Sequence, residues 1–430
     1  MPLISYRVMT LRCSSLILLL LFSTAAGSAS KASLNELTVL AEGGDRTAQL
    51  SLGNSYYFGR HGTQDYKLAF TWYKKAADNG SRTALFNLGL CYEKGHGIKK
   101  DPLKAYTFYK TAAESKITPA VFNLALCYKN GVYDEADRLE YVAPDMEKAE
   151  KLLKKLVSGS PAFPPAYREL AGIYLQKGGP KNEKEAIELL QKGVQAGDPA
   201  AMRMLADCCA AGTGLQKSDE ERISLLEKAA EYGSIEALAK LAFCYEHGES
   251  VKTDRKKAFT YYRKAAEAGF PMAQARMGEY YAFGDFVEQD IAKAKEWFIK
   301  AAKQGNPKAI FNLGLYALEG IGEKKDIKKA VAFFSQAALL EEPHAQYNLA
   351  CFYMQGKGLK KDEKKAFFWF GKAAQQKDPK AQRELAFCYI RGSGTEKNLD
   401  KGMIWLRKAA ANGDIKARNL LDEASAGRLE

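Results

Sequence analysis

The chain has 430 residues, 47% of them hydrophobic, and 64 Lys and Arg against 51 Asp and Glu, which gives a net charge of +13. This composition excludes a wholly disordered chain, and since one core stops growing at about 250 to 300 residues, the length predicts several domains or an array of repeats. The four His, with no CxxC pair and no HExxH sequence, argue against zinc hydrolases, zinc fingers and His-ligated haem. We therefore expect no metal and no cofactor.

The N-terminus has the layout of a secretory signal. Arg7 and Arg12 precede an apolar stretch at 16–22, and small residues follow at 23–30. A membrane-spanning helix needs roughly 20 apolar residues, so this stretch is short for an anchor. We predict a signal peptide at 1–29, a mature N-terminus between Gly27 and Lys31, and a periplasmic or secreted protein. The alternative is an uncleaved N-terminal membrane anchor.

From about Leu34 onward the sequence repeats. Ala-Ala pairs recur, and from Ala229 to Ala409 each step is 36 residues. The pairs begin at Ala76, Ala112, Ala229, Ala265, Ala301, Ala337, Ala373 and Ala409. A period of this length indicates a supersecondary unit that buries its apolar face against its neighbours.

Each period predicts two helices. The first, typified by 84–94, places Ala84, Leu88 and Tyr92 on one stripe. The second should begin after a column made only of capping residue types, ten in all. These residues are Asp65, Asp101, Asp145, Asn182, Ser218, Asp254, Asp290, Asp326, Asp362 and Asn398.

Two columns of the second helix predict its packing. All four Trp share one position, which we interpret as core because helically spaced aromatic residues usually bury area. They are Trp72, Trp297, Trp369 and Trp405. A column of alanines three residues earlier should let helices approach closely. Nothing in the pattern predicts a strand.

The repeated unit resembles the Sel1-like repeat (SLR), a relative of the tetratricopeptide repeat. The resemblance rests on A-x-x-x-L-G-x-x-Y-x-x-G-x-G followed by D-x-x-K-A-x-x-W-Y-x-K-A-A-x-x-G, seen well in 84–116 and 309–341, and it covers nearly all of 34–424. It implies an all-α fold, a right-handed α/α superhelical solenoid of about ten helix-turn-helix repeats. It also implies an adaptor for other proteins, on fold-level analogy.

One region departs from the period. The turn between Gly131 and Met146 carries about eight extra residues, and a proline-rich connection follows at 161–165. We therefore divide the chain into a signal peptide (1–29), N-terminal repeats (30–130), an irregular repeat with an insertion (131–165), C-terminal repeats (166–424) and a tail (425–430). The insertion is either functional or simply tolerated.

The cysteines are expected to be unpaired. Five of them, Cys91, Cys127, Cys208, Cys244 and Cys388, share one position of the first helix. Neighbouring repeats hold such positions about 10 to 20 Å apart, beyond the roughly 7 Å between Cα atoms that a disulfide allows. Exported relatives rich in cysteine pair the two helices of one unit, but here Ala77, Ala113 or Ala230 occupies the partner position.

The sequence favours binding over catalysis. It contains no G-x-S-x-G elbow and no phosphate-binding loop, and its lysines cluster in turns without interleaved arginines, which argues against nucleic-acid binding. We predict a non-enzymatic scaffold for proteins or extended peptides. The alternatives are a weak hydrolase or penicillin-binding-type enzyme, and an endoplasmic-reticulum adaptor in which the sequon at Asn79 is glycosylated. Membrane contact is expected only through the signal segment or surface charge.

We predict that the partner binds the concave surface, through positions 2, 3 and 6 of the first helix. Asparagines at position 3 can donate to and accept from a peptide backbone. Central repeats carry Glu169, Met204, Lys240 and Arg276 there instead, which predicts two patches rather than one groove. The candidate binding residues are Phe86, Asn87, Leu90, Phe122, Asn123 and Leu126 in one patch and Phe311, Asn312, Leu315, Tyr347 and Asn348 in the other.

Overall fold

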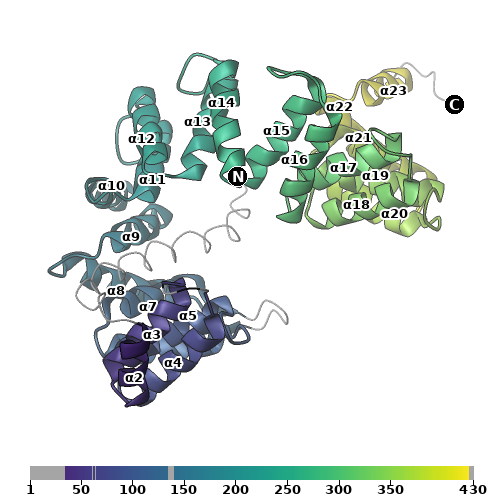
Figure 1. Cartoon of the computed structure of the whole chain (residues 1–430). Helices are drawn as coiled ribbons and strands as arrows, with labels where there is room; N and C mark the ends of the chain where they lie inside the picture. Colours follow the sequence, from purple (N-terminus) through teal and green to yellow (C-terminus); the bar gives the residue numbers. More distant parts are fainter. Residues whose placement is uncertain (1–33, 61, 63, 134–139, 426–430) are drawn as a thin grey trace. The chain divides into compact units, whose positions relative to one another are not determined.

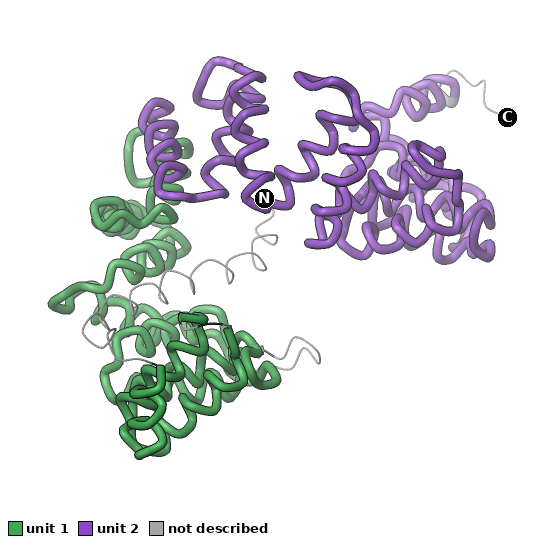
Figure 2. The backbone as a smooth tube through the Cα atoms, in the orientation of Figure 1, with its two compact units in different colours: residues 1–217 green, residues 218–430 purple. Residues whose placement is uncertain are grey.

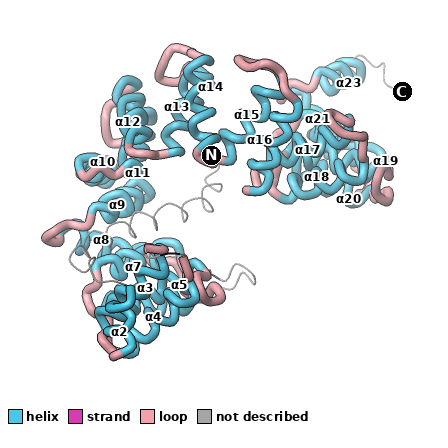
Figure 3. The backbone as a smooth tube through the Cα atoms, in the orientation of Figure 1, coloured by secondary structure: helices cyan, strands magenta, loops and turns pink. Residues whose placement is uncertain are grey.

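The computed structural model describes residues 34–60, 62, 64–133 and 140–425, and the segment predicted to be a signal peptide lies outside these residues. The described residues form 22 helices and two short strands. The helices follow one another as antiparallel pairs joined by short loops (Figure 1, Figure 3). They confirm an all-α solenoid of helix pairs. The chain separates into two compact units, residues 1–217 and 218–430, and each is described by itself (Figure 2).

Unit 1 contains ten described helices and both strands. The helices are α2 (Leu34–Glu42), α3 (Arg46–Phe58), α4 (Tyr66–Asp78), α5 (Arg82–Lys94), α6 (Pro102–Glu114), α7 (Thr118–Asn130), α8 (Met146–Ser158), α9 (Pro164–Lys177), α10 (Pro180–Gln195) and α11 (Pro199–Ala211). Odd-numbered helices from α3 onward are the first helices of repeats, and in this unit α3, α5, α7 and α9 each pack closely on the helix that follows.

Unit 2 contains twelve described helices and continues the same alternation. They are α12 (Asp219–Glu231), α13 (Ile235–His247), α14 (Arg255–Glu267), α15 (Pro271–Phe283), α16 (Ile291–Lys303), α17 (Pro307–Glu319), α18 (Ile327–Leu339), α19 (Pro343–Gln355), α20 (Glu363–Gln375), α21 (Pro379–Arg391), α22 (Leu399–Ala411) and α23 (Ile415–Ser425). Five helix pairs, α13/α14 to α21/α22, lie wholly within this unit.

The predicted capping column is confirmed at nine of its ten positions. Asp101, for example, accepts a hydrogen bond from the Lys104 backbone N–H at 2.9 Å. Asn182 is the exception, because α10 begins earlier, at Pro180, after Gly179. There the proline starts the helix and the Asn182 side chain donates to the Gly178 carbonyl at 2.8 Å.

The expectation that the chain has no strand is wrong in the insertion. Strands β1 (Val132–Tyr133) and β2 (Glu140–Val142) pair antiparallel, with Val132 opposite Val142. The extra residues therefore form a small hairpin, although 134–139 lie outside the described part of the chain.

The tryptophan column lies at the edge of the core rather than at its centre. Trp72 is buried, whereas Trp297, Trp369 and Trp405 are only half-buried. A lysine three residues later lies over three of these rings, 4.1 to 4.3 Å from the ring centre, at Trp72, Trp297 and Trp405. The lysine side chains thus cover the faces of indole rings that are not fully buried in the core.

The centre of the core is the next residue along the second helix. This column is at most 5% exposed throughout. Its members are Tyr73, Tyr109, Leu153, Leu190, Leu226, Tyr262, Phe298, Phe334, Phe370 and Leu406. The predicted alanine column is also buried and is confirmed as the site of close helix approach.

Glycine on the first helix makes room for four of these aromatic rings. A Cβ atom at Gly53, Gly89, Gly278 or Gly314 would lie 2.6 to 2.7 Å from an atom of the ring opposite. Real Cβ atoms do not approach so closely. The Leu-Gly pair in the repeat therefore sets how closely the two helices pack.

Gly314→Ala should destabilise unit 2 by about 1 to 3 kcal/mol, because the new methyl group overlaps the Phe334 ring. Gly371→Ala is the matched control: it lies inside α20 with nothing within 4 Å of its would-be Cβ. That control should be neutral or stabilising by up to about 1 kcal/mol. Urea unfolding of both variants tests this, and equal effects would contradict the packing described.

Candidate functional site

The candidate partner-binding surface is the first-helix face. We define it by positions 3, 6 and 9 of each first helix, counting the buried alanine, such as Ala84 in α5, as position 0. These positions share one stripe because residues three apart lie about one turn apart. The residues predicted from sequence all fall at positions 2, 3 or 6.

Side chains at position 3 reach back to the preceding repeat. The Asn87 amide donates to Asn54 Oδ1 at 3.4 Å, and Glu169 accepts from Lys129 Nζ at 2.7 Å. Arg276 Nε likewise donates to Glu246 Oε1 at 3.1 Å. In these repeats position 3 therefore makes a polar contact with the preceding repeat.

In unit 1 these contacts leave little polar capacity for a partner. Asn54 Oδ1, which receives the Asn87 amide, also accepts from the Tyr73 hydroxyl at 2.9 Å. Asn123 is only 9% exposed and is hydrogen-bonded to the buried Tyr109. The two asparagines of the N-terminal patch thus connect neighbouring parts of unit 1.

Three apolar residues of the N-terminal patch are core residues, so the expectation that they line an open surface is wrong. Phe86, Phe122 and Leu90 are 2%, 0% and 5% exposed. Phe86 and Leu90 pack in one cluster with Tyr109. An interior helix is covered on several sides, so position 2 faces a neighbouring helix. Leu126 is half-buried.

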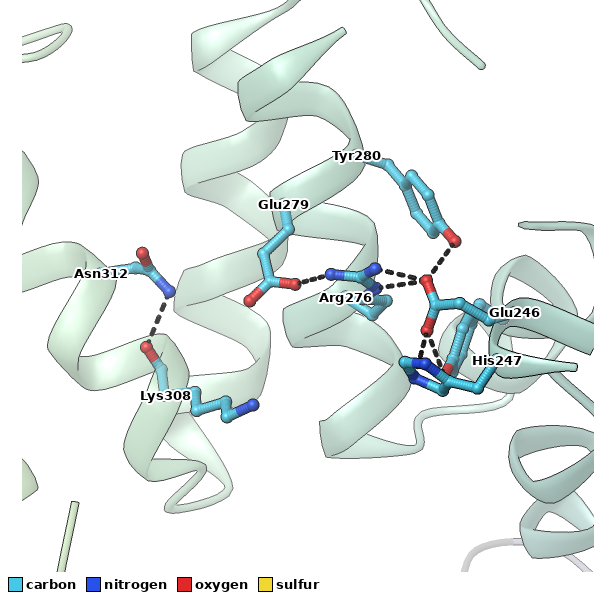
Figure 4. Close-up of polar contacts among 8 residues, drawn as sticks. Glu246, His247, Arg276, Glu279, Tyr280, Lys308 and Asn312 are labelled. Carbon is cyan, nitrogen blue, oxygen red and sulfur yellow. Dashed lines mark hydrogen bonds and ion pairs between the residues drawn. The ribbon is translucent and has the colours of Figure 1, made fainter. Parts of the chain in front are cut away.

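The C-terminal patch in unit 2 is more accessible. Phe311, Leu315 and Tyr347 are half-buried, as are both of its asparagines. Asn312 donates to the Lys308 carbonyl of its own helix at 2.9 Å, and its side-chain oxygen points away from that bond (Figure 4).

Position 9 of the preceding repeat, which supplies the ion-pair partners Lys129 and Glu246 elsewhere, is apolar in the repeats before these two asparagines. Ala282 precedes Asn312 in this way, and Leu318 precedes Asn348. In other repeats the residue at position 9 forms an ion pair with position 3 of the next repeat: Lys129 with Glu169, and Glu246 with Arg276. The two asparagines of the C-terminal patch therefore have no charged residue at position 9 of the preceding repeat, unlike Glu169 and Arg276.

The first repeats of unit 2 carry an ion cluster on the same face. Glu246 accepts hydrogen bonds from Tyr262 at 3.1 Å, from Tyr280 at 3.2 Å and from Arg276, which also contacts Glu279 (Figure 4). Burial opposes ionisation of Glu246, but Arg276 and the tyrosine hydroxyls hold its pKa below the usual range. This arrangement consumes the polar groups that a peptide would use.

Sequence reasoning missed a set of buried glutamines at position 1 of the first helix. Gln49, Gln274, Gln346 and Gln382 are 2% to 6% exposed, and each donates to a backbone carbonyl eight residues earlier. Each also accepts from an amide 30 residues later, as Gln346 does from Gln376 at 3.0 Å. The recurring Ala-Gln pair was the sequence signal.

Asn79 belongs to this series, which bears on the glycosylation sequon. Its amide nitrogen donates to Gln49 Oε1 at 2.9 Å and to the Gly44 carbonyl at 3.3 Å. A glycan attached to this nitrogen would disrupt these two hydrogen bonds between repeats. The amide of Asn79 therefore has a structural role in the folded chain.

The cysteines of the described residues form no disulfide, and their thiols are poorly suited to act as nucleophiles. The seven cysteines are buried or half-buried, and burial raises the pKa of Cys91 to about 12 and that of Cys351 to about 11. Because the thiolate is the nucleophile, these groups do not form an activated catalytic thiol.

The described residues contain no cluster of three or more His, Cys, Asp and Glu that could hold a metal ion. None of their helices is both long enough and apolar enough to cross a membrane.

The Sel1 repeat family model matches the chain ten times. The matches cover residues 47–81, 83–116, 118–158, 164–198, 199–234, 235–270, 271–306, 307–341, 343–378 and 379–414. A comparison with curated proteins found no significant match.

Two solved structures are similar over long stretches. One is c5321, a protective antigen of uropathogenic Escherichia coli with an SLR fold: 28% identity, a TM-score of 0.56, and coverage of 93% of this chain and 91% of that one. The other is a Sel1 repeat protein from Oxalobacter formigenes: 29% identity, a TM-score of 0.53, and coverage of 56% of this chain and 98% of that one.

We predict that none of the seven cysteines after Cys13 forms a disulfide. In the folded protein at pH 8, five of them should react slowly with a thiol reagent, because burial raises their pKa values and keeps them protonated: Cys91, Cys127, Cys208, Cys351 and Cys388. Denatured without reductant, the chain lacking residues 1–29 should yield all seven. A deficit of two or more would show that disulfides form.

Proposed function

Because the chain belongs to the Sel1 repeat family, we propose that it is a non-enzymatic scaffold that binds an extended segment of a partner protein. The proposed site is the C-terminal patch of the first-helix face in unit 2. The fold supports protein binding in general, since helical repeats offer long surfaces for protein partners.

The observation that carries the proposal is the difference between the two pairs of asparagines. Asn87 and Asn123 bond to other elements of unit 1, whereas Asn312 donates to a carbonyl of its own helix and Asn348 is half-buried. An amide with spare capacity can donate to and accept from a peptide backbone.

Half-buried apolar side chains surround these two amides. Phe311, Leu315 and Leu318 pack at the margin of one core cluster, and Tyr347, Cys351 and Met354 at the margin of the next. Such residues offer partly accessible apolar area to a ligand without being fully solvated. The patch therefore suits an extended segment with apolar side chains, while its amides align the backbone.

Asn312→Ala with Asn348→Ala should weaken partner binding by about 1 to 3 kcal/mol, with little loss of helicity. The partner would first be captured from the native compartment with the mature chain as bait, and its affinity then measured by calorimetry. Unchanged affinity, or unfolding of the double variant, would contradict the assignment.

Asn87→Ala with Asn123→Ala is the comparison variant. Removing the Asn123 amide leaves the buried Tyr109 hydroxyl with one fewer partner, so this variant should lower the stability of unit 1. Its effect on binding should be smaller than that of the unit 2 variant. If instead it alone abolishes binding, the site lies in unit 1.

We also propose that the protein is exported and works in the periplasm or outside the cell. The support is the sequence layout of residues 1–29. N-terminal sequencing of protein from its native cells should find a start between Gly27 and Lys31. An intact segment 16–22 in a membrane fraction would show an anchor instead.

A further inference from the structure

The second helices near the end of unit 2 expose apolar side chains at a repeated position. Phe368 in α20 is 52% exposed and Ile404 in α22 is 50% exposed. The two residues are 36 apart and so occupy the same place in successive repeats. Leu399, at the start of α22, is 59% exposed. The core does not account for these exposed side chains.

Lysines flank this apolar position densely. The turns before α18 and α20 both read Lys-Lys-Asp-x-Lys-Lys, and every lysine in them is exposed. They are Lys324, Lys325, Lys328, Lys329, Lys360, Lys361, Lys364 and Lys365.

Most of these lysines carry uncompensated charge. Lys329, Lys361 and Lys365 pair with Glu323, Glu363 and Asp362. The other five have no ion-pair partner among the residues that the structure describes. The aspartates of both turns accept a backbone hydrogen bond as helix caps, so their charge is partly committed to the helix.

Aromatic and basic side chains also alternate along α20. Lys364, Phe368 and Lys372 are four residues apart and share one outward stripe. Lys372 Nζ lies 5.8 Å from the centre of the Phe368 ring. In α22, Lys408 lies over Trp405 at 4.2 Å, next to Ile404. In α20 two lysines thus flank the exposed Phe368, whereas in α22 Asp400 precedes Ile404 by four residues and Lys408 follows it by four.

We propose that this surface, the lysine face of α18, α20 and α22, docks on an anionic lipid bilayer. Lysines contribute point charges without fixed geometry, which suits a diffuse layer of phosphate headgroups. Phe368 and Ile404 would enter the boundary between headgroups and acyl chains, as the apolar side chains of interfacial helices do.

The equivalent surface of unit 1 has the lysines but lacks the exposed aromatic side chain. Lys99, Lys100 and Lys104 correspond to Lys360, Lys361 and Lys365, but Thr107 stands where Phe368 does. Unit 1 therefore offers matched charge without the aromatic side chain, which makes it an internal control.

The lysine face belongs to second helices, whereas the proposed partner site belongs to first helices. A bilayer could therefore hold the chain while the first-helix face stays available to a protein. This inference does not depend on the partner proposal.

The test is flotation of the mature chain with vesicles of neutral phosphatidylcholine or of the same lipid with about 30% phosphatidylglycerol. Binding should require the anionic lipid and fall as salt rises from about 0.05 to 0.3 M. Lys360→Gln, Lys361→Gln and Lys365→Gln together should weaken binding at least about tenfold. The matched triple Lys99→Gln, Lys100→Gln and Lys104→Gln should change it much less.

Insertion is tested by tryptophan fluorescence with brominated acyl chains. Phe368→Trp should add a signal that these lipids quench, and Thr107→Trp should add one that they do not. No binding to anionic vesicles, equal binding to neutral ones, equal losses for the two triples, or an unquenched Phe368→Trp would each overturn the proposal.

Discussion

The structure depends on the close approach of the two helices in each repeat. A large side chain of the second helix, such as Phe334, fills the space that a small residue of the first helix, such as Gly314, leaves open. This contact fixes the spacing within a pair and buries one side of both helices. The remaining sides then pack against neighbouring repeats or stay accessible, and those accessible sides carry the functional proposals.

The sequence predicted the architecture well because repetition averages local signals. A capping residue at one position is weak evidence, but the same column confirmed in nine helices, from Asp65 to Asn398, marks nearly every second helix. The capping column predicted the wrong helix start at Asn182, because α10 begins two residues earlier, at Pro180. The pattern also missed the small hairpin at Val132 and Val142, which lies in an insertion without a counterpart in other repeats.

The candidate site was harder to predict, because a helical stripe does not reveal what its neighbours do. Phe86 and Phe311 occupy the same position, yet Phe86 is buried and Phe311 is half-buried. Asn123 and Asn312 likewise differ only through their surroundings, a tyrosine hydroxyl in one case and a carbonyl of its own helix in the other. Such differences arise from contacts between repeats, which a single column of residues cannot show. The buried glutamines, whose importance lies in inter-repeat hydrogen bonds, went unnoticed for the same reason.

The proposed function depends most directly on contact between a partner protein and the first-helix face of unit 2. Site-specific photocrosslinking in the native compartment tests it most directly, with a photoreactive residue at Leu315 of that face or at Glu296 on the exposed side of the second helix α16. We predict a discrete crosslinked partner from Leu315 and none from Glu296. Crosslinking of the same partner from Glu296 alone would contradict it.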